Sequence, residues 1–235
     1  DTRSSMVTAP ILEIFASLQG EGIRLGEEQI FVRLAGCNMN CDYCDTPLGK
    51  FADHGQHQTA AQVFDRINEI NKLRSYRTIS ITGGEPLLYP EFLLEFLPLC
   101  KQNGFITYCD TNGTLPDVLA LIIPWIDMVS MDFKLESDCH VNVWDSHEEF
   151  LKAGADKIFV KLVVTSRTRD EEILTAVNLI RKINKRIPLV IQPVTPVEGI
   201  DPAPQSMVMH WFEMAHNLIP DTRLIPQKHP EWNVH

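Results

Sequence analysis

Three cysteines stand within eight residues of one another, in the pattern Cys37-x₃-Cys41-x₂-Cys44. Thiolates hold iron–sulfur clusters, and a four-iron cluster normally takes four of them. Three cysteines can bind three irons and leave the fourth without a protein ligand. An open coordination position is typical of a catalytic rather than a structural metal centre. The spacing therefore predicts a [4Fe-4S] cluster with one iron free to bind a small molecule.

A structural zinc site is the alternative for the same cysteines, with His54 or His57 as the fourth ligand. Zinc sites usually pair their cysteines and place a second pair further along the chain, so this pattern fits zinc less well. The remaining cysteines, Cys100, Cys109 and Cys139, are scattered. We expect them to be small buried hydrophobic residues.

Two glycine-containing segments and one arginine could also take part in chemistry. Residues 82–86, Thr-Gly-Gly-Glu-Pro, follow an expected strand, and residues 18–22, Leu-Gln-Gly-Glu-Gly, precede another. Taken alone, both are polar turns in which glycine permits a positive φ. Arg33 offers a planar group that can pair with a carboxylate through two hydrogen bonds. Its other interpretation is a strand residue in a surface ion pair.

Composition limits the class of protein. The chain has 235 residues, a mass of 26.7 kDa and a formal charge of −10. This charge argues against broad binding to nucleic-acid phosphates, although a local basic pocket is compatible with it. No apolar run approaches the ~18–20 residues of a membrane span. We expect a cytoplasmic enzyme that binds neither nucleic acid nor membrane, with a processed or cloning-derived start at Asp1.

Segments with strand and helix patterns alternate along the chain. The expected strands are 30–34, 78–81, 105–108, 127–131, 157–163, 189–192 and 223–225. The expected helices between them are 60–73, 90–103, 117–123, 146–153, 169–184 and 206–218. Such alternation predicts βαβ units and a mostly parallel sheet.

The α/β class can be narrowed further. No GxGxxG follows the first strand, and polar or glycine-rich residues follow several strands, as at the substrate-binding face of a barrel. We therefore expect one domain over residues 1–235, an incomplete (β/α)6-like TIM barrel, with residues 1–12 as an N-terminal extension. Residues 49–58, rich in Gly, His and Asp, are the expected flexible stretch.

The motifs together resemble a known family. Cysteine spacing and the segment 82–86 resemble the cluster loop and the SAM-binding segment of the radical S-adenosylmethionine (SAM) superfamily. Residues 13–22, EIFASLQGEG, and residues 31–46, FVRLAGCNMNCDYCDT, resemble the 7-carboxy-7-deazaguanine synthases, radical SAM lyases of 7-deazapurine (queuosine) biosynthesis. The resemblance is dense over 13–46, clear at 82–86 and 110–113, and patchy afterwards.

The resemblance implies a reaction and its cofactors. The family converts 6-carboxy-5,6,7,8-tetrahydropterin into 7-carboxy-7-deazaguanine with loss of ammonia. The implied route is abstraction of the C6 hydrogen by a deoxyadenosyl radical, followed by Mg²⁺-dependent ring contraction. The implied cofactors are a [4Fe-4S] cluster, SAM and Mg²⁺. The implied partners are an external one-electron donor such as flavodoxin or ferredoxin, and a second copy of the chain in a homodimer.

The resemblance also implies roles for individual residues. The substrate would be contacted by Leu18, Gln19, Gly20, Arg33, Thr82 and His235. SAM would be contacted by Tyr43, Gly84, Glu85, Ser130, Lys134, Gln192, Pro193, Val194 and Thr195. The metal ligands would be Cys37, Cys41 and Cys44 for the cluster and Thr46 for Mg²⁺. No catalytic residue is expected beyond the cluster and SAM.

The chain departs from the family pattern in two places and matches its length in a third. Many members carry Ser-Pro-Lys after the fourth strand, whereas residues 130–134 read Ser-Met-Asp-Phe-Lys, so Lys134 would act from a position two residues displaced. Asp110 stands where the family often has Glu. The family's Gln-x-His, followed by six residues and a terminal carboxylate, matches residues 227–235 in length.

Two other functions compete with this one. Residues 110–113 and 132–134 resemble motifs of the glycyl-radical-enzyme activases, another group of the superfamily whose substrate is a protein backbone. The second alternative is a non-catalytic binding module stabilised by zinc.

Overall fold

A single sheet of nine strands forms the centre of the molecule. The computed structural model describes residues 5–234. The strand order is β3-β1-β2-β4-β5-β6-β7-β8-β9, and every pair from β2 to β9 is parallel. The strands are β1 (Thr8–Leu18), β2 (Glu28–Leu34), β3 (Gln56–Thr59), β4 (Thr78–Gly83), β5 (Ile106–Thr111), β6 (Met128–Phe133), β7 (Ile158–Val164), β8 (Leu189–Pro193) and β9 (Thr222–Leu224). The expected α/β fold with an incomplete barrel is confirmed.

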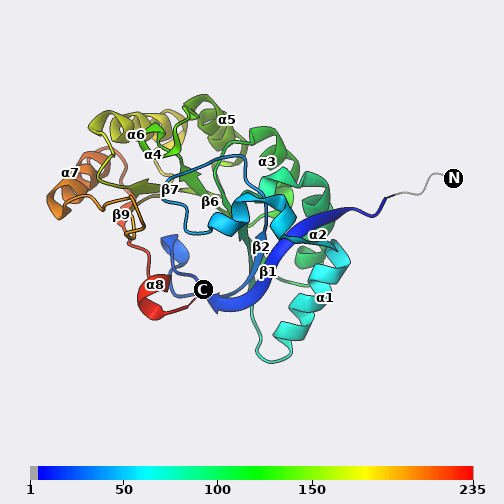
Figure 1. Cartoon of the computed structure of the whole chain (residues 1–235). Coiled ribbons are helices and arrows are strands. Elements are labelled where there is room, and N and C mark those ends of the chain that lie inside the picture. Colours follow the sequence, from blue (N-terminus) through cyan, green and yellow to red (C-terminus); the bar gives the residue numbers. More distant parts are fainter. Residues whose placement is uncertain (1–4, 235) are drawn as a thin grey trace.

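Helices cover the outside of the curved sheet. Figure 1 shows them in an arc from α1 to α7 around the strands. They are α1 (Ala60–Asn71), α2 (Pro90–Gln102), α3 (Pro116–Ile122), α5 (Trp144–Gly154), α6 (Asp170–Asn184) and α7 (Gln205–His216), with two short helices, α4 (Glu136–Cys139) and α8 (His229–Trp232). Local sequence explains where they begin: Thr59 and Gln62 form a capping box at α1, and proline occupies the first position of α2 and α3.

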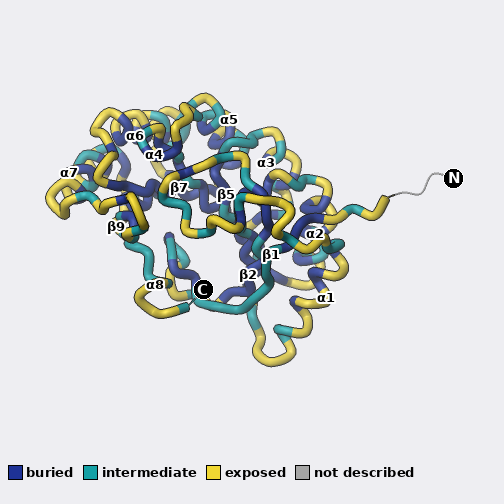
Figure 2. Tube along the Cα trace, viewed as in Figure 1, coloured by how far each residue is buried: buried dark blue, intermediate teal, exposed yellow. Residues whose placement is uncertain are grey.

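The two faces of the sheet differ in chemistry. In β7 the alternate residues Ile158, Val160, Leu162 and Val164 belong to the main hydrophobic core under the helices, whereas Lys161 lies on the other face. Strands β2, β5, β6 and β8 alternate in the same way. Their inner-face residues are Arg33, Asp110, Asp132 and Gln192. Figure 2 shows the strands as the most buried part of the chain and the outer sides of the helices as exposed. These polar side chains therefore lie on the inner face of the sheet, away from the helices.

Two strands were not expected from the sequence. Residues 8–12, assigned to an N-terminal extension, form the first part of β1, which pairs antiparallel with β2 and with β3. Residues 49–58, expected to be flexible, contain two short 3₁₀ turns and the first residues of β3. Pairing across 45 to 51 residues of sequence forms these two strand segments, which have no apolar periodicity of their own.

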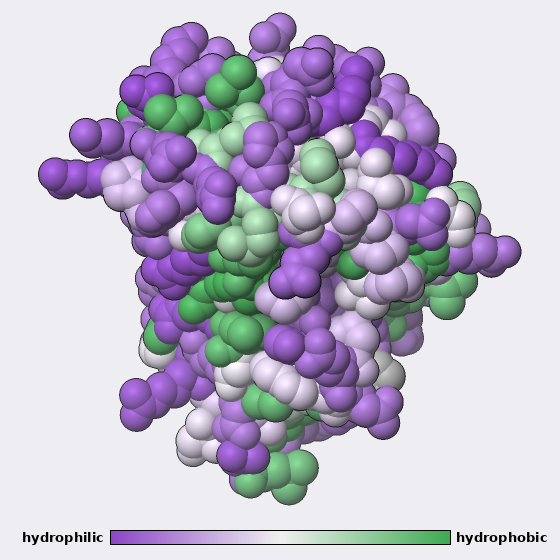
Figure 3. Space-filling model, turned by 90° about the vertical axis from the view of Figure 1, so that its left-hand side faces the viewer, coloured by the Kyte–Doolittle hydropathy of each residue, from purple (hydrophilic) through white to green (hydrophobic). Residues whose placement is uncertain are grey.

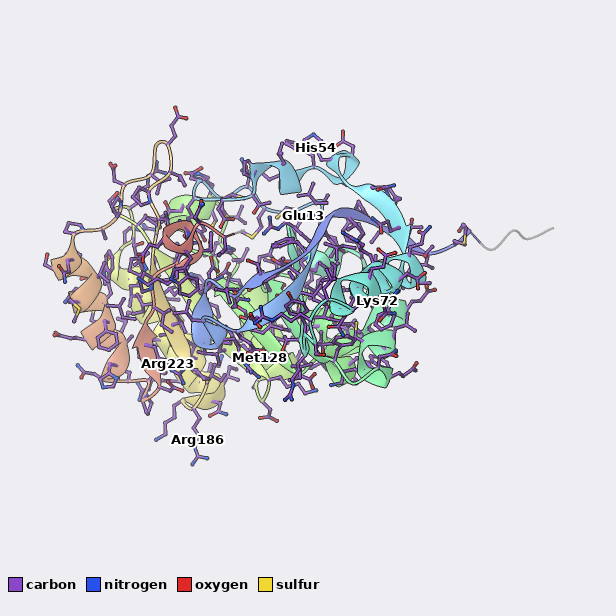
Figure 4. The ribbon with its side chains drawn as sticks, turned by 90° about the horizontal axis from the view of Figure 1, so that it is seen from below. Glu13, His54, Lys72, Met128, Arg186 and Arg223 are labelled. Atoms are coloured by element: carbon purple, nitrogen blue, oxygen red, sulfur yellow. The ribbon has the colours of Figure 1, made fainter. Side chains whose placement is uncertain are left out.

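The carboxyl ends of the parallel strands share one edge of the molecule. In Figure 4, His54 of the loop after the cysteines lies at the opposite side from Met128, Arg186 and Arg223, which lie near the beginnings of β6, β8 and β9. The cysteine loop is thus at the edge where barrel enzymes bind substrate.

The outer surface carries both hydrophilic and hydrophobic residues. Figure 3 shows a face that is mostly hydrophilic, with a strip of hydrophobic residues down its middle. Over residues 5–234, no helix has the length and apolar character needed to cross a lipid bilayer.

Candidate active site

One cavity at the carboxyl edge of the sheet brings most of the expected site residues together. Those lining it are Leu18, Gln19, Gly20, Arg33, Cys37, Cys41, Tyr43, Cys44, Thr46, Thr82, Gly84, Lys134, Gln192 and Val194. They come from β1, β2, β4, β6, β8 and the loops that follow them. His235 lies outside the described residues. Segments that are spread over 177 positions of sequence, from Leu18 to Val194, therefore line the same cavity.

The cysteine loop is held against neighbouring loops by backbone hydrogen bonds. The amide of Gly36 donates to the carbonyl of Gly49 (2.7 Å), and the amide of Cys37 donates to the carbonyl of Lys50 (3.2 Å). The side-chain amide of Asn112, after β5, donates to Oδ1 of Asn38 (2.8 Å). These contacts hold the loop in place from both sides, so the three thiols have a fixed location.

The three thiols fit an iron–sulfur cluster better than a single zinc ion. All three line the same cavity. Within the part of the chain that the structure describes, no group of three or more His, Cys, Asp or Glu side chains is close enough to hold one metal ion. Neither His54 nor His57, the histidines expected as a fourth zinc ligand, lines the cavity with the three thiols. The cluster requires neither.

Glycines let the segment 82–86 approach the cysteine loop. A Cβ on Gly84 would lie 2.1 Å from the carbonyl oxygen of Gly36, so no larger residue fits without moving the backbone. Gly83 has φ +140°, and a Cβ there would lie 2.0 Å from the carbonyl oxygen of Leu34. The two glycines are needed to bring the end of β4 against the end of β2.

Glu85, an expected SAM contact, does not line the cavity. Its side chain is fully buried, and its carboxylate accepts hydrogen bonds from the amide of Leu87 (3.0 Å), the hydroxyl of Thr111 (2.7 Å) and the amide of Asn112 (2.7 Å). Burial raises the pKa of Glu85 to about 7, against the effect of these donors. In this structure Glu85 joins the end of β4 to the loop after β5.

Lys134 and Tyr43 lie together between the cysteine loop and β6. Nζ of Lys134 is 5.1 Å from the centre of the Tyr43 ring and 2.9 Å from a carboxylate oxygen of Asp132. A cation over an aromatic face is attracted by the ring quadrupole. Lys134 therefore reaches the expected site despite its displacement in sequence.

Arg33 is held in position by two side chains of β1. It forms an ion pair with Glu13, and its guanidinium carbon lies 5.2 Å from the centre of the Phe15 ring. Residues Glu13 and Arg33 are register partners in the β1–β2 pair, which places them side by side. The guanidinium is thus fixed, while its position in the cavity wall leaves it accessible to a ligand.

A buried charge network was missed by the sequence analysis. Lys161 forms an ion pair with Glu21 and lies 3.4 Å from Asp132 and 4.0 Å from Asp110. Burial alone would raise the pKa of Glu21, but the charge of Lys161 and hydrogen bonds from Gln227 and Lys161 lower it to about 2. Burial raises the pKa of Asp110 to about 6. The available signal was a lysine in the middle of an otherwise apolar strand, residues 158–164.

The end of the described chain covers one side of the cavity. The side-chain amide of Gln227 donates to Glu21, and the amide of Lys228 donates to the carbonyl of Gly20 (2.8 Å). His229 packs closely against Gly20. A Cβ atom added to Gly20 would lie 2.6 Å from the Cβ of His229. Figure 1 shows α8 beside the first strand at the open side of the sheet.

The other expected residues lie in or just behind the wall. Thr46 lines the cavity, and its hydroxyl donates to the carboxylate of Asp45 (3.1 Å). Ser130 and Pro193 do not line it, and Ser130 is buried. Thr195 is also outside the wall, with its hydroxyl donating to Gln227 (2.6 Å).

Cys139 is closer to the site than its sequence position indicates. All three scattered cysteines are buried, as expected. However, Sγ of Cys139 lies 2.9 Å from Sγ of Cys41. The prediction of a purely structural role therefore misses a contact with an expected metal ligand, because nothing in the sequence relates positions 98 residues apart.

Comparisons with known proteins agree with this geometry. The model of the radical SAM superfamily matches residues 31–193. A 7-carboxy-7-deazaguanine synthase of Geobacter sulfurreducens is 35% identical, over 94% of this chain and 96% of the relative. The one of Methanothermobacter thermautotrophicus is 36% identical over 82% and 85%.

Solved structures match the fold. The crystal structure of QueE from Escherichia coli gives a TM-score of 0.65 at 22% identity, covering 94% of both chains. TYW1 with a lysine–pyruvate adduct bound gives 0.59 at 18% identity, covering 80% of this chain and 73% of that one. At these identities the likeness concerns the fold. The sequence relatives decide between the expected functions, and the activase and the zinc module are set aside: the chain belongs to the radical SAM superfamily and, within it, to the 7-carboxy-7-deazaguanine synthase family of lyases.

Proposed function

We propose that the protein converts 6-carboxy-5,6,7,8-tetrahydropterin into 7-carboxy-7-deazaguanine and ammonia, for queuosine or another 7-deazapurine. The observation that carries the proposal is the placement of Arg33 and the three cysteines in the wall of one cavity. A fixed guanidinium suits a carboxylated substrate, and three thiols suit a cluster with one open iron. The names of the relatives give the same activity.

The cluster would be held by Cys37, Cys41 and Cys44, and together with SAM it would supply the radical that removes the C6 hydrogen. Tyr43, Gly84, Lys134, Gln192 and Val194 line the cavity and would surround SAM. Glu85, Ser130, Pro193 and Thr195 would act from behind this wall, by fixing the backbone that does the binding. Glu85, whose carboxylate accepts three hydrogen bonds from neighbouring residues, is the clearest case.

The substrate would lie between Arg33 and the buried charge network. Arg33 would bind the substrate carboxylate, with Leu18, Gln19, Gly20 and Thr82 around it. Asp110, whose pKa burial raises to about 6, can hold or release a proton near neutral pH. Glu21 stays ionised beside Lys161. Asp110 lines the same cavity as Arg33 and lies 4.0 Å from Lys161, so we propose that proton transfer during loss of ammonia falls to Asp110 rather than to the ion-paired Glu21. His235 stays a prediction.

Mg²⁺ would bind at Thr46, next to the carboxylate of Asp45. Both residues line the cavity, and Mg²⁺ prefers oxygen ligands and keeps several waters. The homodimer, the cytoplasmic location and a flavodoxin or ferredoxin as electron donor remain predictions.

The test is a product assay. Anaerobically reconstituted protein, reduced and supplied with SAM, Mg²⁺ and the carboxytetrahydropterin, should yield the deazapurine, identified by mass spectrometry. Cys41→Ala should lose cluster binding and SAM cleavage while the circular dichroism spectrum is kept. Thr46→Ala should keep the cluster and need more Mg²⁺. SAM cleavage by wild type without deazapurine at any Mg²⁺ concentration would contradict the assigned substrate.

A further inference from the structure

Cys139 approaches the cysteine loop from a different part of the chain. It is the last residue of the short helix α4, and its Sγ lies 2.9 Å from Sγ of Cys41, with Cys139 as the donor. Both residues are buried, at 2% and 8% exposure. Cys139 does not line the cavity, whereas Cys41 does. The thiol therefore stands behind a cluster ligand rather than among the ligands.

The contact is fixed by bonds on both sides of it. The amide of Asp42 donates to the carbonyl of Asp138 (3.0 Å), and the imidazole of His140 is 2.8 Å from the carboxylate of Asp42. The hydroxyl of Thr165 donates to the side chain of Asp138 (2.8 Å). The neighbours of Cys139 are thus tied to the neighbour of Cys41, which keeps the two sulfurs together.

A chain of donors leads to this contact from a buried ammonium group. Nζ of Lys134 is 3.4 Å from the hydroxyl oxygen of Tyr43, and that oxygen is 3.7 Å from Sγ of Cys139. An ammonium group can only donate, so the Tyr43 hydroxyl is free to donate to Cys139, which in turn donates to Cys41. The side chain of Lys134 is 11% exposed, which limits competition from water.

We propose that Cys139 is a positioning residue of the metal centre, whose thiol donates a hydrogen bond to the Cys41 sulfur and raises the reduction potential of the cluster. Reduction adds negative charge, and a donor to a ligand sulfur stabilises the more negative state. The hydrogen bonds from Lys134 to Tyr43 and from Tyr43 to Cys139, a relay of donors, make the Cys139 thiol a stronger donor to Cys41. The inference rests on the proposed function, because it assumes that Cys41 binds the cluster.

The direct test is a potential measured by electron paramagnetic resonance during a redox titration of the reconstituted protein. Cys139→Ala should shift the potential to a more negative value. We expect up to a tenfold change in the reduction equilibrium constant, about 59 mV for one electron. Cys139→Ser keeps a donor and should recover part of the shift. Tyr43→Phe, which removes the hydroxyl of the relay, should shift the potential in the same direction by less.

Cys100→Ala is the matched control, because it removes another buried thiol, from α2 in the hydrophobic core. Its potential should equal that of the wild type. An unchanged potential in Cys139→Ala, at equal iron and sulfide content, would overturn the proposal. So would an iron-to-protein ratio that falls in Cys139→Ala and Cys139→Ser alike, since that would make Cys139 a cluster ligand.

A second measurement needs no cluster. In the Cys37→Ala/Cys44→Ala background, diamide should oxidise Cys41 and Cys139 to a disulfide, each thiol losing one proton and one electron to the reagent. The chain should lose the mass of two hydrogens, and a peptide map should join the two cysteines. No cross-link would refute the geometry. If the wild-type protein binds no iron but forms this cross-link, the proposed function is contradicted, whereas the contact between the two sulfurs is confirmed.

Discussion

Neighbouring residues of β7 belong to two different environments. Leu162 points into the core beneath the helices, whereas Lys161 points into the cavity and contacts carboxylates from three other segments. Both side chains are almost fully buried, at 0% and 5% exposure. The outer face of the sheet is stabilised by apolar contacts that many residues could make. The inner face depends on charges that must be matched one by one.

Lys161→Met tests the inner face and should have the largest effect on stability. Removing one partner of a buried ion pair costs about 3–5 kcal/mol because the other charge stays buried and unpaired. The pKa of Glu21, about 2 in the wild type, should rise towards or above its usual value. Wild-type stability from this pair is present above about pH 4.5 and is lost as the pH falls towards 2.

The measurement is the free energy of unfolding as a function of pH. The difference between wild type and Lys161→Met should shrink as the pH drops from about 4.5 to about 2, because the unpaired carboxylates become protonated. A difference that stays constant over this range would mean that Lys161 acts by packing alone.

Leu162→Ala tests the outer face and should cost about 2–5 kcal/mol, through lost burial and the cavity that remains. No charge is involved, so this loss should be independent of pH from 2 to 7. The folded fraction should retain SAM cleavage at temperatures well below its melting point. A pH-dependent loss comparable to that of Lys161→Met would remove the distinction between the two faces.

Arg33→Lys should have the smallest effect on stability and a clear effect on substrate binding. Lysine keeps the charge but cannot pair with a carboxylate through two parallel hydrogen bonds. We expect a roughly 10- to 100-fold rise in KM for the carboxytetrahydropterin, about 1.4–2.8 kcal/mol, with the KM for SAM within twofold of the wild type. Equal rises in both constants would contradict a role at the substrate end of the cavity.

The outer face could be predicted from sequence, and so could the cavity residues that local motifs mark, but the buried charge network could not. All seven expected strands and all six expected helices are present within a few residues of their predicted bounds. Their signal is periodic burial, which each segment carries within itself. By contrast, β1 and β3 depend on pairing with each other, and the patterns of residues 8–12 and 56–59 gave no indication of it.

The candidate site divides in the same way. The cysteines, Arg33 and Gly84 were found because local motifs mark them. Lys161 and Cys139 were missed because their partners, Glu21 and Cys41, lie 140 and 98 residues away. Glu85 was assigned to SAM, but its carboxylate bonds the loop after β5, a contact that only the folded chain defines.

The hydrogen bond between Gln227 and Glu21 joins positions 206 residues apart. All the residues between these two positions have to be joined before this side of the pocket can form. The three cysteines, by comparison, lie within eight residues of one another. A chain truncated before Gln227 would therefore keep its three cysteines but lack the hydrogen bond that joins this side of the pocket to Glu21.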